Sequence, residues 1–194
     1  MQTDTRPRNC SYDLGGRAAM VTGAAGAIGS GVCRGLLQAK CRVAATDLAG
    51  PRLDGLVEEL RSTFGDNIIG VPMDVTSPAS VSCGVDAICR AFGSLDIAII
   101  NAGLAHVSPI RDMNLEDFER IERVNVHGTL AVLHELAKRF ETQGTGGDVV
   151  LISTKNVFSP GATFGAYSAT KAAAHQLARI ASLEYAPFDI RVNM

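Results

Sequence analysis

The sequence lacks the features that mark several large classes of protein. It has no apolar run near the roughly 18 residues that cross a bilayer, and its polar first residues lack the apolar core of a signal peptide. Its 18 basic and 20 acidic side chains leave a net charge of −2, which provides no positive field for nucleic acid or anionic lipid. We therefore expect a soluble cytoplasmic protein that binds neither nucleic acid nor membrane.

The cysteines and histidines lack the spacing of disulfide frameworks or zinc sites. The five cysteines are odd in number and include no C-x-x-C pair, and none of the four histidines has a cysteine partner at zinc-ligand spacing. We expect reduced thiols and no metal site. The cysteines are Cys10, Cys33, Cys41, Cys83 and Cys89.

The chain also lacks internal repeats, low-complexity tracts and linkers. Its 194 residues, 46% of them hydrophobic, are enough for one domain with a sizeable core. Only the first dozen or so residues look dispensable for the fold of this domain. We predict a flexible N-terminal segment over 1–15 and one domain over 16–194.

What the sequence does contain is a regular alternation of strands and helices. Short apolar runs with little polar alternation are typical of strands in a parallel sheet that helices cover on both faces. The predicted strands are 18–23, 42–47, 68–74, 95–103, 147–153 and 189–193, and the predicted helices are 28–39, 53–63, 78–92, 115–141 and 166–185.

Helix boundaries support these ranges. Ser77 followed by Pro78 is typical of a helix start, and Asn114 with Asp117 resembles a capping pair. The alternation predicts an α/β fold with a doubly wound parallel sheet, a Rossmann fold in three α/β/α layers. Because the sixth strand begins so near Met194, we expect the last strand of the fold to be missing from this domain.

The first strand-to-helix turn is a candidate dinucleotide site. It reads TGAAGAIG, and its glycines allow a close approach to a pyrophosphate at the N-terminus of the next helix. Asp47 ends the second strand, where its carboxylate would bind the adenosine ribose and repel a 2′-phosphate, so NAD is favoured over NADP. The alternative interpretation of Asp47 is a solvated acid at the end of the strand, or a helix cap. The predicted contacts are Gly23, Ala25, Gly26, Ala27, Ile28, Gly29, Asp47 and Leu48.

A second group of residues has the chemistry of proton transfer. Tyr167 and Lys171 form Y-x-x-x-K, and four residues on a helix place both side chains on one face. An ammonium near a phenol favours the phenolate and suits tyrosine for acid–base work. Thr154 follows the fifth strand and offers a hydroxyl, while Asn125 lies within a helix, where its side chain can hold a water or a backbone carbonyl.

Together these motifs resemble the single-domain branch of the short-chain dehydrogenase/reductase family. The matching elements are the glycine turn, Asp74-Val75, Asn101-Ala102-Gly103, Asn125, Ser153-Thr154, Tyr167-x-x-x-Lys171 and the closing Ile190 to Asn193. The resemblance implies hydride transfer between a nicotinamide and a secondary alcohol or ketone.

The resemblance also implies a role for each matching residue. Tyr167 would be the acid–base, Lys171 would bind the nicotinamide ribose, Asn125 would anchor a relay water, and Thr154 would hold the substrate oxygen. Contacts to the cofactor would come from Asp74 and Val75 at the adenine, from Asn101, Ala102 and Gly103 along its length, and from Tyr167 and Lys171.

Departures from the family pattern leave alternatives open. The glycines are spaced G-x-x-G-x-x-G, as in the extended branch that includes epimerases, and Thr154 stands where serine is usual.

The stretch from Gln143 resembles dehydrogenases of sugars and polyols. The leading interpretation is an NAD-dependent dehydrogenase that forms homodimers or homotetramers through helices 115–141 and 166–185. Its rival is a partial or non-catalytic NAD-binding chain without a substrate segment.

Overall fold

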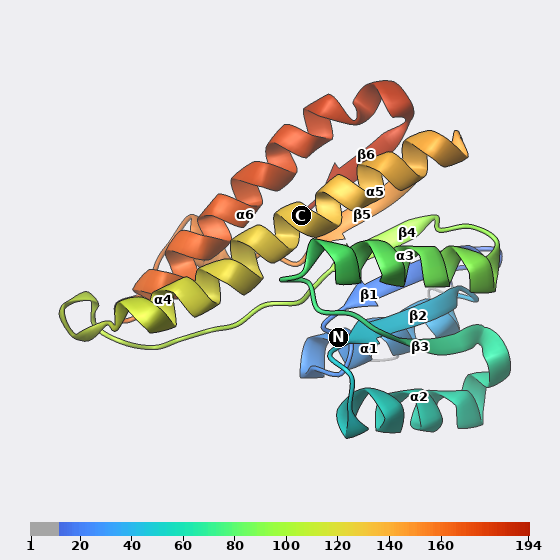
Figure 1. Ribbon diagram of the computed structural model, residues 1–194, viewed down its shortest axis with the longest axis horizontal. Coiled ribbons are helices and arrows are strands. Elements are labelled where there is room, and N and C mark those ends of the chain that lie inside the picture. The colour runs from blue at the N-terminus through green and yellow to red at the C-terminus, as the bar shows by residue number, and fades with distance from the viewer. Residues whose placement is uncertain (1–11) are drawn as a thin grey trace, which may run out of the picture.

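The computed structural model describes residues 12–194, in which helices and strands alternate along the chain (Figure 1). Residues 1–11 lie outside the described part, and with them Cys10 and most of the predicted N-terminal segment. Over residues 12–194, no helix is both long and apolar enough to cross a membrane.

The strands form one parallel sheet in the order β3-β2-β1-β4-β5-β6. This order confirms the predicted doubly wound topology. The direction of winding reverses between β1 and β4, and in such sheets ligands bind at the carboxyl ends of the strands beside this reversal. The strands are β1 (Ala18–Thr22), β2 (Arg42–Asp47), β3 (Ile68–Pro72), β4 (Ile97–Ile100), β5 (Gly147–Leu151) and β6 (Ile190–Asn193).

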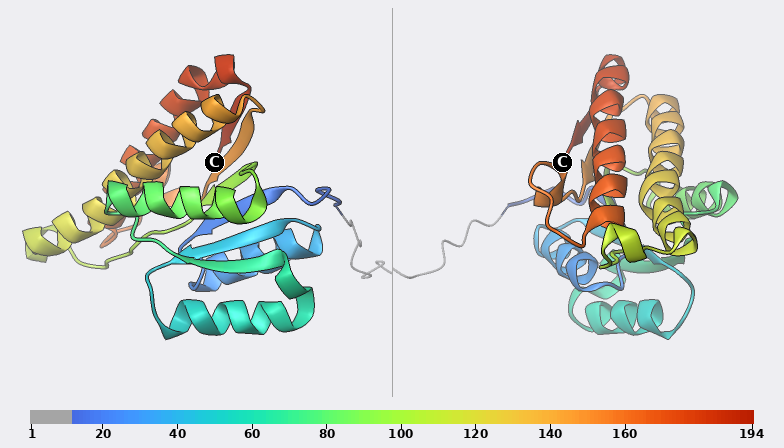
Figure 2. Two further views of the ribbon diagram at one scale, coloured as in Figure 1. Left: turned by 45° about the vertical axis from the view of Figure 1, so that its right-hand side comes forward. Right: turned by 90° about the vertical axis from the view of Figure 1, so that its left-hand side faces the viewer.

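Helices cover both faces of the sheet, which completes the predicted three layers (Figures 1 and 2). On one face lie α1 (Ala27–Gln38) and α2 (Pro51–Phe64), and on the other lie α3 (Pro78–Phe92), α5 (Thr129–Gln143) and α6 (Gly165–Glu184). Helix α4 (Leu115–Glu122) projects beyond the sheet. Short 3₁₀ turns are η1 (Gly65–Asn67), η2 (Ile110–Asp112), η4 (Lys155–Val157) and η5 (Ala186–Phe188).

The sheet divides the apolar interior into two clusters. Met20, Ala98 and Ile100 face α3, α5 and α6, whereas Val21 and Ile99 face α1 and α2. Every residue of β1 is fully buried, so alternate side chains of this strand contribute to both clusters. The continuous apolar runs of the sequence reflect this burial on two faces.

The predicted helix caps are found, with one difference. The Ser77 hydroxyl accepts the Ser80 N–H at 3.3 Å, and the Asn114 side chain accepts the Glu116 N–H at 2.9 Å. Asp117, the expected partner of Asn114, instead pairs with Arg120 at 3.1 Å. A side chain at this position can reach either the helix start or the next turn, and here the arginine provides the stronger, charged partner.

The predicted helix over 115–141 is interrupted without a loop. Residues Arg123–Gly128 form a π-helical turn, η3, between α4 and α5. Gly128 lies here against Val75, and a Cβ atom on this glycine would stand 2.8 Å from Val75 Cγ2. Single π turns inside α-helices are frequent at functional sites. Asn125 lies in this turn. Its side chain therefore points in a different direction from the one that the predicted regular α-helix would give it.

Candidate active site

The glycine turn packs against the end of the neighbouring strand. Gly23 adopts a φ of 63°, and a Cβ on it would lie 2.8 Å from Ala102 Cα. A Cβ on Gly29 would overlap the carbonyl oxygen of Gly23 and would lie 2.8 Å from Ala24 Cα. These two glycines are therefore required by close backbone contacts within the turn.

The N-terminus of α1 is left open toward the turn. Gly26 is the N-cap, no side chain of residues 12–194 caps this end, and the first turn contains no acidic residue. The N–H groups of Ala27, Ile28 and Gly29 thus begin a helix whose own first turn contributes no carboxylate to offset its partial positive charge. Such an end fits a diphosphate, because phosphate oxygens accept these N–H groups.

Asp47 is held in place beside this turn. One of its carboxylate oxygens accepts the Ala25 N–H at 2.9 Å, and the other accepts the Leu48 N–H at 2.8 Å. The Arg52 guanidinium donates to the Ala25 carbonyl at 3.1 Å, so side chains bind both the N–H and the carbonyl of Ala25. Each oxygen of Asp47 keeps a second lone pair, which is available to a ligand hydroxyl.

Asp74 and Val75 shape the loop after β3. Asp74 Oδ1 accepts both the N–H and the hydroxyl of Thr76, at 2.9 and 2.7 Å, and the Asp74 N–H donates to the Ser80 hydroxyl. This is an Asx-type turn that directs the chain into α3. Val75 contacts Gly128, so the loop connects the cofactor side of the sheet to the π turn.

Asn101 joins the ends of β1 and β4. Its amide nitrogen donates to the carbonyls of Thr22 and Gly23 at 2.9 and 3.0 Å. In return, the buried Thr22 hydroxyl accepts the N–H groups of Asn101 and Ala102, each at 3.0 Å. The hydrogen bonds of Asn101 and Ala102 therefore hold the start of the glycine turn against the end of β4.

Gly103 lies between two of the predicted catalytic side chains. A Cβ on Gly103 would stand 3.2 Å from Asn125 Oδ1 and 3.3 Å from Lys171 Nζ. The structure thus brings Asn125, from η3, and Lys171, from α6, to the loop after β4. The predicted family residues from three separate parts of the chain meet here.

Lys171 is a buried cation. Its side chain belongs to a residue that is 6% exposed, and its ammonium donates to the Ile152 carbonyl at 2.9 Å. Burial lowers the pKa of the Lys171 ammonium from its ordinary value. A buried ammonium bound to one neutral carbonyl is costly, and groups of this kind cluster at functional sites.

Tyr167 and Thr154 lie on elements that contact each other. Tyr167 is half-buried in the first turn of α6, with its ring edge-on to Phe164 at a centroid distance of 6.3 Å. Thr154 caps η4, and its hydroxyl accepts the Asn156 N–H at 3.3 Å. Helix α6 packs against both η3 and η4, so Asn125, Thr154, Tyr167 and Lys171 come from one set of adjoining elements.

Sequence reasoning missed several polar residues that organise this region. Thr22 and Thr170 are buried, and their hydroxyls bind Asn101 and Asn125 respectively. Ser153 contacts His175 Nδ1 at 3.1 Å. A signal for the burial of Thr170, though not for its hydrogen-bond partner, was available, since Thr170 lies four residues after the apolar Ala166 on the buried face of a helix.

Comparison with known proteins identifies the family. The chain matches the family model described as short chain dehydrogenase over residues 17–194. It therefore belongs to the short-chain dehydrogenase/reductase family, and it is an oxidoreductase of a family that binds nicotinamide cofactors.

Individual relatives agree with this family. The chain is 33% identical over 178 residues to the uncharacterized oxidoreductase YuxG of Bacillus subtilis, covering 91% of this chain but 26% of YuxG. It is 30% identical to D-threitol dehydrogenase of Mycolicibacterium smegmatis, covering 94% of this chain and 69% of that enzyme. The solved structure of NAD⁺-bound xylitol dehydrogenase superposes with a TM-score of 0.85 at 30% identity, covering 92% of this chain and 68% of that one.

Two glycines of this region predict opposite effects on stability. Gly29→Ala places a methyl group against backbone atoms of the turn, so we expect a loss of about 1–3 kcal/mol in the free energy of unfolding. Gly31→Ala, two residues further along α1, meets no atom within 4 Å and should gain about 0.5–1 kcal/mol from helix propensity. Urea unfolding of both variants measures the difference. Equal effects would contradict the close packing of the turn.

Burial of Lys171 predicts a pH-dependent cost to stability. Since its pKa is lowered by burial, the unfolded chain keeps the proton to a higher pH than the folded one. The wild-type protein therefore gains stability as pH rises from the folded-state pKa of Lys171 to its unfolded-state pKa. Below both values, the folded protein bears the full free-energy cost of the buried charge. Lys171→Met should be more stable than wild type near pH 7, and this advantage should shrink toward about pH 10.

Urea midpoints over this pH range test the cost, with Lys138→Met as the control. Lys138 is exposed on α5, so its replacement should produce no such trend. A Lys171→Met protein that is less stable than wild type at every pH would contradict the assigned burial cost.

Proposed function

We propose that this chain is an NAD-dependent dehydrogenase that oxidises a secondary alcohol, or reduces the matching ketone. The observation that carries the proposal is the buried ammonium of Lys171 beside Gly103, next to the Asn101 junction that supports the glycine turn. This arrangement supports a proton-transfer group and a dinucleotide turn that would lie together at the carboxyl ends of β1 and β4.

The cofactor would lie along these strand ends. The open N-terminus of α1, with Gly23, Gly26 and Gly29, supports binding of a diphosphate. Asp47 and Leu48 would contact the adenosine ribose, Asp74 and Val75 the adenine, and the Asn101–Gly103 segment the remaining length. The free lone pairs of Asp47 suit ribose hydroxyls, whereas its charge would repel the extra phosphate of NADP.

The residues around Gly103 have the chemistry for the proton half of the reaction. NAD, when bound, supplies the acceptor for the hydride of the carbinol carbon. The Tyr167 phenolate would take the hydroxyl proton, and the positive charge of Lys171 would favour that phenolate. The Thr154 hydroxyl would hold the substrate oxygen. The Asn125 amide is already bound to the backbone of Leu104, so its role would be to fix this segment.

The substrate class that we propose is a sugar or polyol. D-threitol dehydrogenase and xylitol dehydrogenase are among the relatives and neighbours, and both are named for polyols. An exposed active-site edge with the half-buried hydroxyl of Thr154 is compatible with a substrate that carries several hydroxyl groups.

Assembly and location extend the same proposal. We propose that residues 16–194 form a single cofactor-binding and catalytic domain in the cytoplasm. We also propose that it forms homodimers or homotetramers through α4–α5 and α6. Exposed apolar side chains on these helices support the interface, namely Leu115, Leu130, Ile180 and Leu183.

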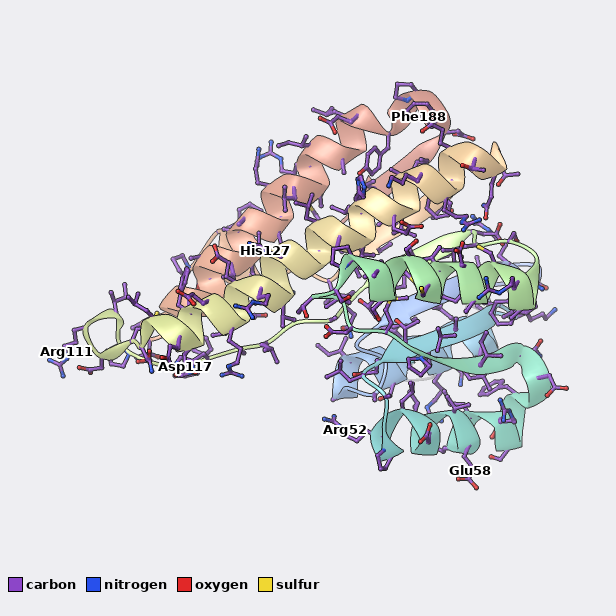
Figure 3. All side chains as sticks on the ribbon, viewed as in Figure 1. Arg52, Glu58, Arg111, Asp117, His127 and Phe188 are labelled. Carbon is purple, nitrogen blue, oxygen red and sulfur yellow. The ribbon has the colours of Figure 1, made fainter. Side chains whose placement is uncertain are left out.

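Cofactor choice is the first test. Asp47→Ser removes the carboxylate that would bind the ribose, so NAD affinity should fall about tenfold or more, and the preference over NADP should narrow. Glu58→Gln is the control, because Glu58 is an exposed acid on α2 that points away from the sheet (Figure 3). Calorimetric titration of both proteins with both cofactors measures the effect. If wild type binds NADP as tightly as NAD, the role assigned to Asp47 is wrong.

Turnover is the second test. Tyr167→Phe removes the transferable proton and should reduce NADH production at least about a hundredfold while NAD affinity stays nearly unchanged. The control is Tyr185→Phe at the other end of α6, where the hydroxyl only donates to the Leu133 carbonyl. The substrates are threitol, xylitol and simple secondary alcohols.

The outcomes separate the two functions considered for this chain. NAD binding with turnover that depends on Tyr167 supports the dehydrogenase. NAD binding without turnover on any of these alcohols would instead favour the non-catalytic cofactor-binding chain. Wild-type turnover by Tyr167→Phe would overturn the proposed mechanism.

A further inference from the structure

One hydroxyl connects the helix of Tyr167 and Lys171 to the π-helical turn. Thr170 lies between these two residues on α6 and is 2% exposed. Its Oγ1 atom accepts a hydrogen bond from Asn125 Nδ2 at 3.0 Å. The single hydroxyl proton is directed toward the carbonyls of Ala166 and Tyr167, at 2.8 and 3.1 Å. The hydroxyl proton of Thr170 and one lone pair of its oxygen are therefore both used within the protein interior.

These contacts determine the orientation of the Asn125 amide. Asn125 Oδ1 accepts the Leu104 N–H at 2.8 Å, and Nδ2 donates to the Leu104 carbonyl at 2.9 Å and to Thr170. Both N–H groups of the amide are thus used. A flipped amide would face the Leu104 N–H with a donor and the Leu104 carbonyl with an oxygen, so only one orientation satisfies the set.

The amide in turn fixes the segment that borders the lysine. Leu104 follows Gly103 directly, and Gly103 is the residue on which a Cβ would approach Asn125 Oδ1 and Lys171 Nζ within 3.3 Å. The side chain of Asn125 binds both backbone polar groups of Leu104. A displacement of this amide would therefore move the Gly103–Leu104 segment relative to the ammonium.

We propose that Thr170 is a positioning residue, whose hydroxyl holds the Asn125 amide so that the Gly103–Leu104 segment stays in register with Lys171. This role rests on the proposed function, because the segment borders the groups assigned to proton transfer. Removing the hydroxyl without changing the side-chain shape leaves a buried N–H of Asn125 without an acceptor. An unsatisfied buried donor strongly favours rearrangement of the amide.

The test is hydrogen exchange at the Leu104 amide, which Asn125 protects in an otherwise exposed stretch of chain. In Thr170→Val, exchange at Leu104 should accelerate about tenfold or more. The Ser108 amide, which donates to the Thr163 carbonyl at 2.8 Å, is the internal reference in the same loop and should change little. Thr170→Ser keeps the hydroxyl and should restore protection of Leu104.

A second variant separates this effect from a general loss of stability. Thr46→Val also removes a buried threonine hydroxyl, one that donates to the Val21 carbonyl at 3.0 Å, in β2. It should lower the free energy of unfolding without accelerating exchange at Leu104 more than at Ser108. If Thr170→Val does not fold, the comparison of Thr170→Ala with Thr170→Ser isolates the hydroxyl in the same way.

Turnover provides the readout that a purely structural residue would not move. Thr170→Val should reduce kcat about tenfold or more while NAD affinity by calorimetry stays within about threefold, and Thr170→Ser should recover kcat. If Thr170→Val accelerates exchange at Leu104 selectively but leaves kcat unchanged, the positioning role is overturned. It is also overturned if exchange at Leu104 is no faster in Thr170→Val than in Thr46→Val. Absence of turnover in the wild type counts against the proposed function instead, and exchange at Leu104 then decides whether the hydroxyl holds the segment.

Discussion

The site depends on the hydrogen bonds that tie Asn101 to Thr22. The Asn101 amide donates to the carbonyls of Thr22 and Gly23, and the Thr22 hydroxyl accepts the N–H groups of Asn101 and Ala102. These bonds close the gap where β1 and β4 end and the chain departs in opposite directions. Without them, the glycine turn would lose the backbone against which Gly23 packs, and the Gly103–Leu104 segment would lose its anchor. Both halves of the proposed active site therefore share one buried polar junction.

From this junction the polar groups extend outward in a connected series. Gly103 contacts the amide of Asn125 and the ammonium of Lys171, and Asn125 reaches Thr170 on α6. The side-chain amides of Asn101 and Asn125 have protein acceptors for both of their N–H groups, which holds the segment in place in spite of its exposure. The main cost is Lys171, whose charge is buried against a single carbonyl. Proteins retain such costs at functional sites, because a charge that water does not screen acts more strongly on the groups around it.

The sequence was sufficient to predict the order of elements, and less so the details of the site. Strands such as Arg42–Asp47 were found from apolar runs alone, since burial on both faces leaves a distinct signal. The π turn at Asn125 was missed because residues 115–141 were interpreted as one continuous α-helix, and a single π turn is too short to give a period of its own. The roles of Thr22 and Thr170 could not be predicted either, because their partners are 79 and 45 residues away in the sequence. Long-range polar contacts are set by packing, and no local pattern encodes them.

The two apolar clusters explain how the two halves of the site can differ in their tolerance of change. Helices α1 and α2, which support the glycine turn and Asp47, pack into one cluster, whereas α5 and α6 pack into the other on the opposite face of the sheet. Each helix belongs to one cluster alone, whereas strands such as β1 and β4 contribute to both, so a cavity under α6 would disturb Lys171 and Thr170 before it reached Asp47. The cofactor turn and the proton-transfer group can therefore vary separately, provided that the Asn101 junction between them is kept. Under the proposed function, changes at the end of β2 would then alter which dinucleotide binds, and changes around α6 would alter the chemistry performed on it.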